Sequence, residues 1–314
     1  MVDPFNLIAK SEKIMRRAKD VKIHRAKTTK IASIIGKQIK KKNLLTASQF
    51  GVIDQTDNGA QLVFLEDTVN FCFWPSRGEP KWQVQNENKK LTDGWVALTM
   101  CFRRALASGV PILGTDYIQR ASLQDWQKFF QGENSVEIPL FSKRVANLRE
   151  AAKVLQAKYD GHFKNVILVS KRNAVKLVKL ISRDFPSFRD PFLKRAQIIV
   201  YDIYLMFEGK NRGNLKNIDK LTAFADYKLP QILRELGVLE YSQNLANKVD
   251  SQQEIPSGTA QEEEIRAATI IAVELFKQHL PNIISPQIDN VLWSLSQNNR
   301  FTPRPYHRTR TIFY

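Results

Sequence analysis

Apolar residues follow helical spacing along most of this chain. They recur three and four positions apart, as amphipathic helices require, in residues 5–42, 94–109, 123–130, 140–159 and 166–181. N-terminal helix signals (Asp-Pro, a run of acids and Ser-Pro) predict three more helices, in residues 190–208, 262–280 and 285–296. Between residues 50 and 90 the pattern is mixed, because residues 62–74 fit a strand or a helix and residues 78–90 fit a short hairpin. The pattern predicts a mainly α-helical fold with a small mixed α/β element near residues 50–90.

The length allows one large domain or two interlocked ones. We expect a single helical domain over residues 1–314, or its subdivision into an N-terminal lobe, 1–120, and a catalytic helical lobe, 121–314. The clearest predicted loop spans residues 252–261.

A carboxylate stands at a predicted bend. Ile218, Leu221, Phe224 and Ala225 have helical spacing, and Pro230 then suits the first turn of a second helix. Asp226 lies between these two segments, near the amide-rich start of the second helix. It either ties the bend together by accepting backbone N–H groups or faces a cleft as an ionised acid. Spacing alone favours the first interpretation and leaves the second open.

The positive charge of the chain is concentrated near its N-terminus and suggests a possible ligand. The net charge is +17, and residues 1–42 carry thirteen Lys and Arg against three acids, an excess of ten. Such a patch attracts nucleic acid or phosphorylated ligands, although the apolar positions of the same segment also fit a solvated helix face. No apolar run is long enough to span a bilayer, and the first residues lack a signal-peptide pattern. With only Cys72 and Cys101, we expect a reduced, cytoplasmic protein without a zinc site.

Familiar cofactor and nucleophile motifs are absent from the sequence, so neither a metal nor a nucleotide cofactor is expected. Asp202 is the one acid in an apolar run, and a buried charge needs a partner such as Lys194 or Arg195. Asp289 and Trp293 are four residues apart on a predicted helix, so they share a face. Asn70 and Trp74 share one as well if their segment is helical, with Phe71 beside them. Aromatic faces beside hydrogen-bonding groups suit a purine-like base, although an ordinary aromatic core has the same composition.

The order of several sequence blocks resembles the queuosine salvage proteins, which are queuosine 5′-phosphate N-glycosylases. The blocks span nearly the whole chain and include VNFCFW (69–74), GWVALTMCFRRALASGVPI (94–112), LTAFADYKLPQILRELGVLEYS (221–242), IDNVLW (288–293) and the terminal PYHRTRTIFY. The resemblance implies a helical fold similar to the helix-hairpin-helix DNA glycosylases. It also implies hydrolysis of the bond between the 7-deazaguanine base queuine and ribose 5-phosphate, a small-molecule substrate, without a membrane or a stable nucleic-acid partner.

The same resemblance assigns roles to residues. Asp226 corresponds to the family's catalytic aspartate, and Phe224 and Ala225 line the base pocket. The further implied or candidate substrate contacts are Asn70, Phe71, Asp289, Asn290, Trp293, Asp202 and, as cations for the phosphate, Lys194, Lys228 and His307. Where family members often have a second acid after the aspartate of IDxxLW, this chain has Ser294, which puts one substrate contact in doubt.

Two other functions remain open from the sequence. A DNA-base glycosylase would fit the charge and the implied fold, but the turn at residues 236–240 has a single glycine and an acid where such enzymes use a glycine-rich hairpin. A non-catalytic tRNA- or RNA-binding protein would use the basic residues 1–42.

Overall fold

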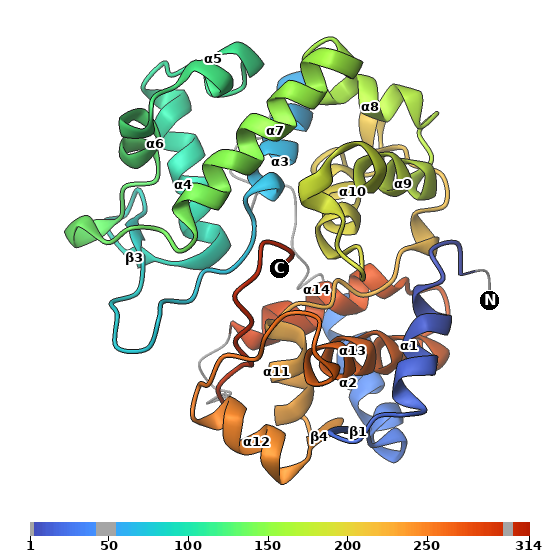
Figure 1. The fold of residues 1–314 in the computed structure, drawn as a ribbon. Helices are drawn as coiled ribbons and strands as arrows, with labels where there is room; N and C mark the ends of the chain where they lie inside the picture. The colour runs from blue at the N-terminus through green and yellow to red at the C-terminus, as the bar shows by residue number, and fades with distance from the viewer. Residues whose placement is uncertain (1–2, 42–54, 298–303) are drawn as a thin grey trace. The chain divides into compact units, whose positions relative to one another are not determined.

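The structure is a computed structural model of the 314-residue chain, and it describes residues 3–41, 55–297 and 304–314. These residues form two compact units (Figure 1). The terminal unit contains the described residues up to 41, residues 217–312 apart from the gap, and Tyr314; the middle unit contains residues 55–216 and Phe313. Both are built mainly from helices, as predicted. The boundary considered near residue 120 falls inside the middle unit.

The terminal unit combines segments from both ends of the chain. Its helices are α1 (Leu7–Met15), α2 (Thr28–Lys40), α11 (Lys228–Glu235), α12 (Gln243–Asp250), α13 (Ala260–Gln278) and α14 (Ser285–Ser296), with short 3₁₀ turns at Arg25–Lys27 and Ile218–Lys220. Strand β1 (Val21–Ile23) pairs antiparallel with β4 (Leu239–Tyr241), and Val21 lies opposite Tyr241. This pairing joins the N-terminal segment to the chain that follows α11.

Helix α13 is the centre of the terminal unit. Every residue from 264 to 276 is buried, and α1, α2, α11 and α14 all contact this helix. Its first turn carries Glu262 and Glu263, which suit the positive end of the helix dipole. A helix buried on all sides must satisfy its polar side chains internally, and these side chains build the candidate site described below.

The middle unit is built around α3 (Asp57–Thr68), which is buried from residue 59 to its end. Its other helices are α4 (Gly94–Ala107), α5 (Thr115–Arg120), α6 (Leu123–Phe129), α7 (Phe141–Tyr159), α8 (Phe163–Val169), α9 (Ala174–Asp184) and α10 (Lys194–Met206), with 3₁₀ turns at Glu133–Ser135, Pro186–Phe188 and Asn211–Gly213. The ring of Phe64 on α3 stacks on Phe163, with 4.4 Å between centroids. The predicted hairpin is confirmed: β2 (Val84–Gln85) pairs antiparallel with β3 (Leu91–Thr92).

Three predicted helices differ from the structure. Residues 166–181 form parts of two helices, α8 and α9, because Lys171 and Arg172 adopt left-handed backbone angles and Asn173 caps α9. Helix α10 begins at Lys194, although Asp190 does accept the Lys194 N–H at 2.8 Å. Residues 221–226 were predicted as helix and are instead irregular and buried. Of the mixed element predicted near residues 50–90, the part before residue 55 lies outside the described residues, and α3 begins at Asp57.

None of the helices described is both long and apolar enough for a membrane span. Cys72 and Cys101 are buried and not joined in a disulfide.

Candidate active site

The irregular segment 221–226 brings the predicted catalytic acid into a buried setting. All six residues are buried, so their backbone groups need partners other than water. Two of these partners are side chains from distant helices: Asp289 on α14 accepts the Phe224 N–H at 2.7 Å, and Arg266 on α13 donates to the Ala225 carbonyl at 3.0 Å. The segment is therefore held by α13 and α14 instead of by a helical ladder.

Asp226 lies at the N-terminus of α11 and is 8% exposed. Its Oδ1 accepts the N–H groups of Lys228 and Leu229 at 2.8 and 2.9 Å. Within the described chain, nothing donates a hydrogen bond to its second oxygen, Oδ2. This arrangement fixes a carboxylate by one oxygen and leaves the other available to a positively charged group.

The residues predicted beside Asp226 in the terminal unit are all found near the same segment or on α14. Phe224 and Ala225 precede Asp226 directly, and both are buried. Asp289 and Asn290 are buried on α14, and Trp293, one turn later, is half-buried. The helix predicted for the Asp289–Trp293 pair is confirmed. One carboxylate oxygen of Asp289 already binds Phe224, a structural role that sequence reasoning did not anticipate.

The two cations predicted in this unit differ in their surroundings. The ammonium of Lys228, at the start of α11, donates to Gln231 at 3.1 Å and lies 5.4 Å from the ring centroid of Tyr306. His307 is 1% exposed, and burial together with the positive charge of Arg266 lowers its pKa to about 3. A neutral, buried imidazole does not supply the charge for which His307 was predicted as a phosphate ligand.

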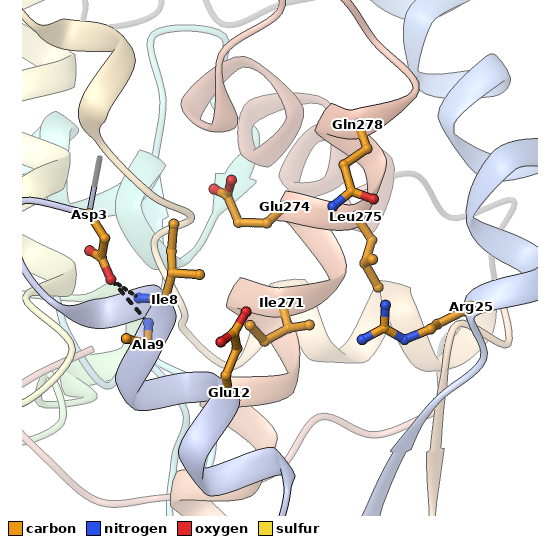
Figure 2. A pocket seen from close by; sticks show the side chains of 9 residues that line it. All are labelled: Asp3, Ile8, Ala9, Glu12, Arg25, Ile271, Glu274, Leu275 and Gln278. Atoms are coloured by element: carbon orange, nitrogen blue, oxygen red, sulfur yellow. Dashed lines mark hydrogen bonds between the residues drawn. The ribbon is translucent and has the colours of Figure 1, made fainter. Parts of the chain in front are cut away.

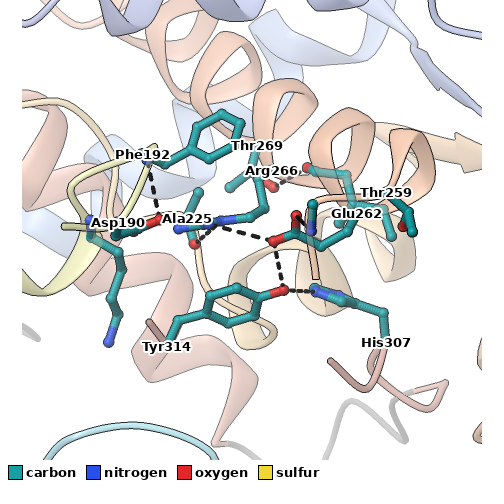
Figure 3. Close-up of polar contacts among 12 residues, drawn as sticks. Asp190, Phe192, Ala225, Thr259, Glu262, Arg266, Thr269, His307 and Tyr314 are labelled. Carbon is teal, nitrogen blue, oxygen red and sulfur yellow. Dashed lines mark hydrogen bonds and ion pairs between the residues drawn. The ribbon is translucent and has the colours of Figure 1, made fainter. Parts of the chain in front are cut away.

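His307 instead belongs to a buried polar network (Figure 3). The Tyr314 hydroxyl donates to Glu262 at 2.9 Å, and His307 Nε2 lies 3.3 Å from the same hydroxyl. Glu262 also lies 3.4 Å from a terminal nitrogen of Arg266, whose guanidinium carbon is 4.4 Å from the Tyr314 ring centroid. Burial, and then the Glu262 charge, raise the pKa of Tyr314 well above its usual value, so the hydroxyl keeps its proton.

In the middle unit the predicted residues Asn70 and Phe71 follow the end of α3. Their segment is irregular, with a left-handed backbone at Cys72, so the helical alternative considered for Asn70 and Trp74 is wrong. The Asn70 amide donates to Asp67 at 2.9 Å. The Phe71 ring is 1% exposed, and the guanidinium carbons of Arg144 and Arg195 lie 4.4 and 5.1 Å from its centroid. Two arginines thus already lie against the Phe71 ring. The contact of this ring with the base of the substrate stays a prediction.

Buried carboxyl groups gather around α3 and α10. Asp202, Asp67 and Glu66 are all less than 10% exposed, and burial raises the pKa of each. The charge of Asp67 raises the pKa of Asp202 further, whereas the nearby Lys194 lowers the pKa of both groups. The predicted neighbour Lys194 thus lies near Asp202 as one member of a larger group of buried charged residues.

Sequence reasoning missed Asp67 and Arg266. Asp67 lies in the mostly apolar stretch 62–74, and Arg266 directly precedes the mostly apolar stretch 267–276, so a charged residue beside an apolar run is the signal that could have found them. In the described parts of the chain, no three His, Cys, Asp or Glu side chains are grouped so as to hold a metal ion. A pocket of about 410 Å³ in the terminal unit lies between α1 and α13 (Figure 2). It is lined by Glu12, Arg25 and Glu274 among others, and by none of the predicted site residues.

Comparison with known proteins gives one consistent result. Residues 52–314 match the family described as queuosine salvage protein. The chain is 41% identical over 268 residues to the queuosine 5′-phosphate N-glycosylase/hydrolase of Sphaerobacter thermophilus, a match that covers 81% of each chain. It is 37% identical to the mouse protein of the same name, over 80% of this chain and 81% of the mouse protein. The protein of that name from Schizosaccharomyces pombe is 30% identical, over 80% and 82%.

Proposed function

This chain belongs to the queuosine salvage protein family, and we propose that it hydrolyses queuosine 5′-phosphate to queuine and ribose 5-phosphate, which makes queuine available for tRNA modification. In this reaction the bond between the base nitrogen and the ribose C1′ breaks. Water supplies the oxygen that C1′ gains and the proton that the base gains. The substrate is a small molecule, and no stable nucleic-acid partner is required.

The observation that carries the proposal is the fixed carboxylate of Asp226. Breaking an N-glycosidic bond builds positive charge on the sugar, and a preorganised carboxylate stabilises that charge. The two amides of α11 hold Oδ1 in place, so Oδ2 does not have to be reoriented during the reaction. The same oxygen can act on the sugar electrostatically, as a base for water or as a nucleophile, and all three roles use this geometry.

The base increases the demand on this carboxylate. A 7-deazapurine has no N7 to protonate, so the leaving group is not activated there and more of the barrier falls on the sugar side. Queuine also carries a secondary amine that is cationic at neutral pH, and we propose Asp289 as its partner through a charge-assisted hydrogen bond. Phe224, Ala225, Asn290 and Trp293 are proposed to line the base pocket, and Lys228 to bind the phosphate.

The other predicted contacts, Asn70, Phe71, Lys194 and Asp202, belong to the middle unit and are proposed as further substrate ligands. We also propose that the helices follow an arrangement similar to the helix-hairpin-helix DNA glycosylases, and that the enzyme is cytoplasmic. Free, buried cysteines support a reducing compartment.

The direct test is incubation with queuosine 5′-phosphate and detection of free queuine by mass. We expect turnover by the parent protein and a loss of kcat of at least about a thousandfold in Asp226→Asn, the scale on which one preorganised charge acts in an active site. Asp219→Asn is the matched control, because Asp219 is a half-exposed acid paired with Lys220 only seven residues earlier. It should keep the parent kcat.

Two results would contradict the proposal. If the parent protein leaves queuosine 5′-phosphate intact, the proposed reaction is wrong. If Asp226→Asn releases queuine at the parent rate, the reaction stands but Asp226 is not its catalytic residue.

A further inference from the structure

The residues on both sides of Asp226 are held by contacts that lead to residues 304–314, the C-terminal segment. Residues 221–226 have no helical ladder, so the position of the carboxylate depends on what fixes Ala225 and Tyr227. On the N-terminal side, the Ala225 carbonyl accepts a hydrogen bond from Arg266, which is 1% exposed. Arg266 is in turn held by Glu262 and covered by the ring of Tyr314.

The Tyr314 hydroxyl is the group that joins this chain of contacts together. It donates its one proton to Glu262, so His307 must be the donor in the remaining contact and carries its proton on Nε2. The second oxygen of Glu262 accepts the Gly258 N–H at 3.2 Å. With both oxygens of Glu262 engaged, the carboxylate keeps Arg266 in one orientation, and Arg266 keeps the Ala225 carbonyl in one orientation.

A second contact holds the C-terminal side of Asp226. The rings of Tyr227 and Tyr306 lie 4.8 Å apart at an interplanar angle of 41°. Two residues before Tyr306, the Arg304 carbonyl accepts a hydrogen bond from Gln231 of α11 at 2.7 Å. The C-terminal segment therefore contacts α11 directly and reaches the residue before Asp226 through α13.

We propose that the C-terminal segment positions the catalytic carboxylate, with Tyr314 acting through Glu262 and Arg266 on Ala225, and Tyr306 acting on Tyr227. Tyr314, Glu262 and Arg266 are positioning residues, because they act through other groups and not on the substrate. The expected effect on turnover rests on the proposed function. The positioning of Asp226 itself does not depend on it.

The test compares Tyr314→Phe, which removes only the bridging hydroxyl, with Tyr241→Phe. Tyr241 is also a buried tyrosine of the terminal unit, and its ring lies 4.8 Å from the buried Arg234 guanidinium, which pairs with Asp250. The control thus perturbs a similar Arg–acid–Tyr group that lacks the link to Ala225. Arg266→Lys and Arg234→Lys form a second matched pair, since lysine keeps the charge but loses the planar fork.

The first measurement is amide hydrogen exchange at Lys228 and Leu229, whose N–H groups bind Asp226 Oδ1. We expect Tyr314→Phe and Arg266→Lys to reduce the protection of these two amides by roughly tenfold, and the two controls to leave it unchanged. Unchanged protection in Tyr314→Phe would overturn the proposal whether or not the protein is active, so the proposal does not fail merely because the proposed reaction fails.

The second measurement is turnover of queuosine 5′-phosphate. We expect Tyr314→Phe to lower kcat by about tenfold with little change in KM, because a displaced carboxylate weakens transition-state stabilisation more than binding. In the Asp226→Asn background the same change should have no further effect on the residual rate. A loss of equal size in both backgrounds would show a general structural defect and contradict the positioning role.

Discussion

Asp289 illustrates how one residue can carry both a structural and a substrate-binding role. One of its oxygens accepts the buried Phe224 N–H, so removing that acceptor leaves an unpaired donor. We expect Asp289→Ala to lower the free energy of unfolding by about 1–3 kcal/mol, the usual cost of an unsatisfied buried group. Asp289→Asn keeps an acceptor and should retain most of that stability. Denaturant titration of both variants measures this difference.

The same two variants separate the roles of Asp289. If its charge binds the amine of queuine, Asp289→Asn should raise KM for queuosine 5′-phosphate although the protein remains nearly as stable as the parent. An unchanged KM would leave Asp289 with its structural role alone. Equal stability of the Ala and Asn variants would contradict the importance of the Phe224 hydrogen bond.

The carboxyl group of Asp202 predicts how stability depends on pH. Burial and the neighbouring Asp67 raise its pKa in the folded protein well above the usual value. As pH rises above about 4, the unfolded chain loses this proton while the folded protein retains it, so the free energy of unfolding falls with rising pH. We expect Asp202→Asn to remove this contribution, and therefore to be more stable relative to the parent at pH 8 than at pH 5. Urea titrations at both pH values test the sign.

Asp184 provides a control of opposite sign. Its hydrogen bonds with Arg183, Tyr159 and Lys158 hold the pKa of that carboxyl well below its usual range, so it stabilises the fold above pH 4 and loses this effect as pH falls. Asp184→Asn should therefore be less stable than the parent at pH 8. Between pH 5 and pH 8 the stability of Asp184→Asn relative to the parent should stay constant. A rise like the one expected for Asp202→Asn would contradict the assignment of the pH dependence to the Asp202 carboxyl.

Helix α3 ends at Thr68, beside the buried guanidinium of Arg195. Arg195 on α10 donates to the carbonyls of Asp67, Thr68 and Ser187, so it pairs the Thr68 carbonyl at the end of α3 and adds a second donor to that of Asp67. Arg144 on α7 donates to the carbonyls of Val69, Phe71 and Cys72. These two arginines fix the irregular segment that carries Asn70 and Phe71.

This arrangement predicts that substitutions of two arginines lower the free energy of unfolding by different amounts. Arg195→Met leaves three buried carbonyls without this donor. We expect the free energy of unfolding to fall by at least about 3 kcal/mol, about 1 kcal/mol for each carbonyl. Arg149→Met is the matched control, because Arg149 is only half-buried and donates to the single carbonyl of Ala121 at 2.7 Å. It should cost about 1 kcal/mol or less. Similar losses in thermal denaturation would show that the three carbonyls contribute little.

The elements also show which parts of the fold the sequence could predict. Helix α14 matches its prediction from Ser285 to Ser296, because its start signal and apolar spacing are local. The break between α8 and α9 was not predictable, since Ala174 N–H donates to the Lys216 carbonyl at 2.9 Å, a partner 42 positions away. The helix predicted for residues 221–226 is wrong for the same reason. Their apolar spacing fits a helix, but their backbone groups bind Arg266 and Asp289, which lie on helices distant in the sequence.

Within the candidate site, the sequence predicted which residues lie near one another better than it predicted their contacts. The geometry of Asp226 confirms the first interpretation, since its carboxylate accepts two backbone N–H groups of α11. Its catalytic role, which the resemblance implies and spacing alone did not, stays a prediction. Predicting His307 as a cation required knowing its burial, and burial depends on contacts with Arg266 and Tyr314 that no local pattern reveals.

At the scale of the whole molecule, the net charge of +17 bears on whether the protein acts on nucleotides or on nucleic acid. Lys13, Arg16, Arg17 and Lys22 are exposed, and none belongs to the candidate site. We expect weak RNA binding at low salt that disappears near physiological ionic strength, because such contacts act by counterion release. Replacing all four with Gln should weaken this binding and reduce its salt dependence, while kcat/KM for queuosine 5′-phosphate stays at the parent value. Titration of a labelled tRNA at two salt concentrations, beside the turnover assay, tests both parts. Tight tRNA binding that survives physiological salt, together with a fall in turnover in the Gln variant, would instead favour a function on nucleic acid.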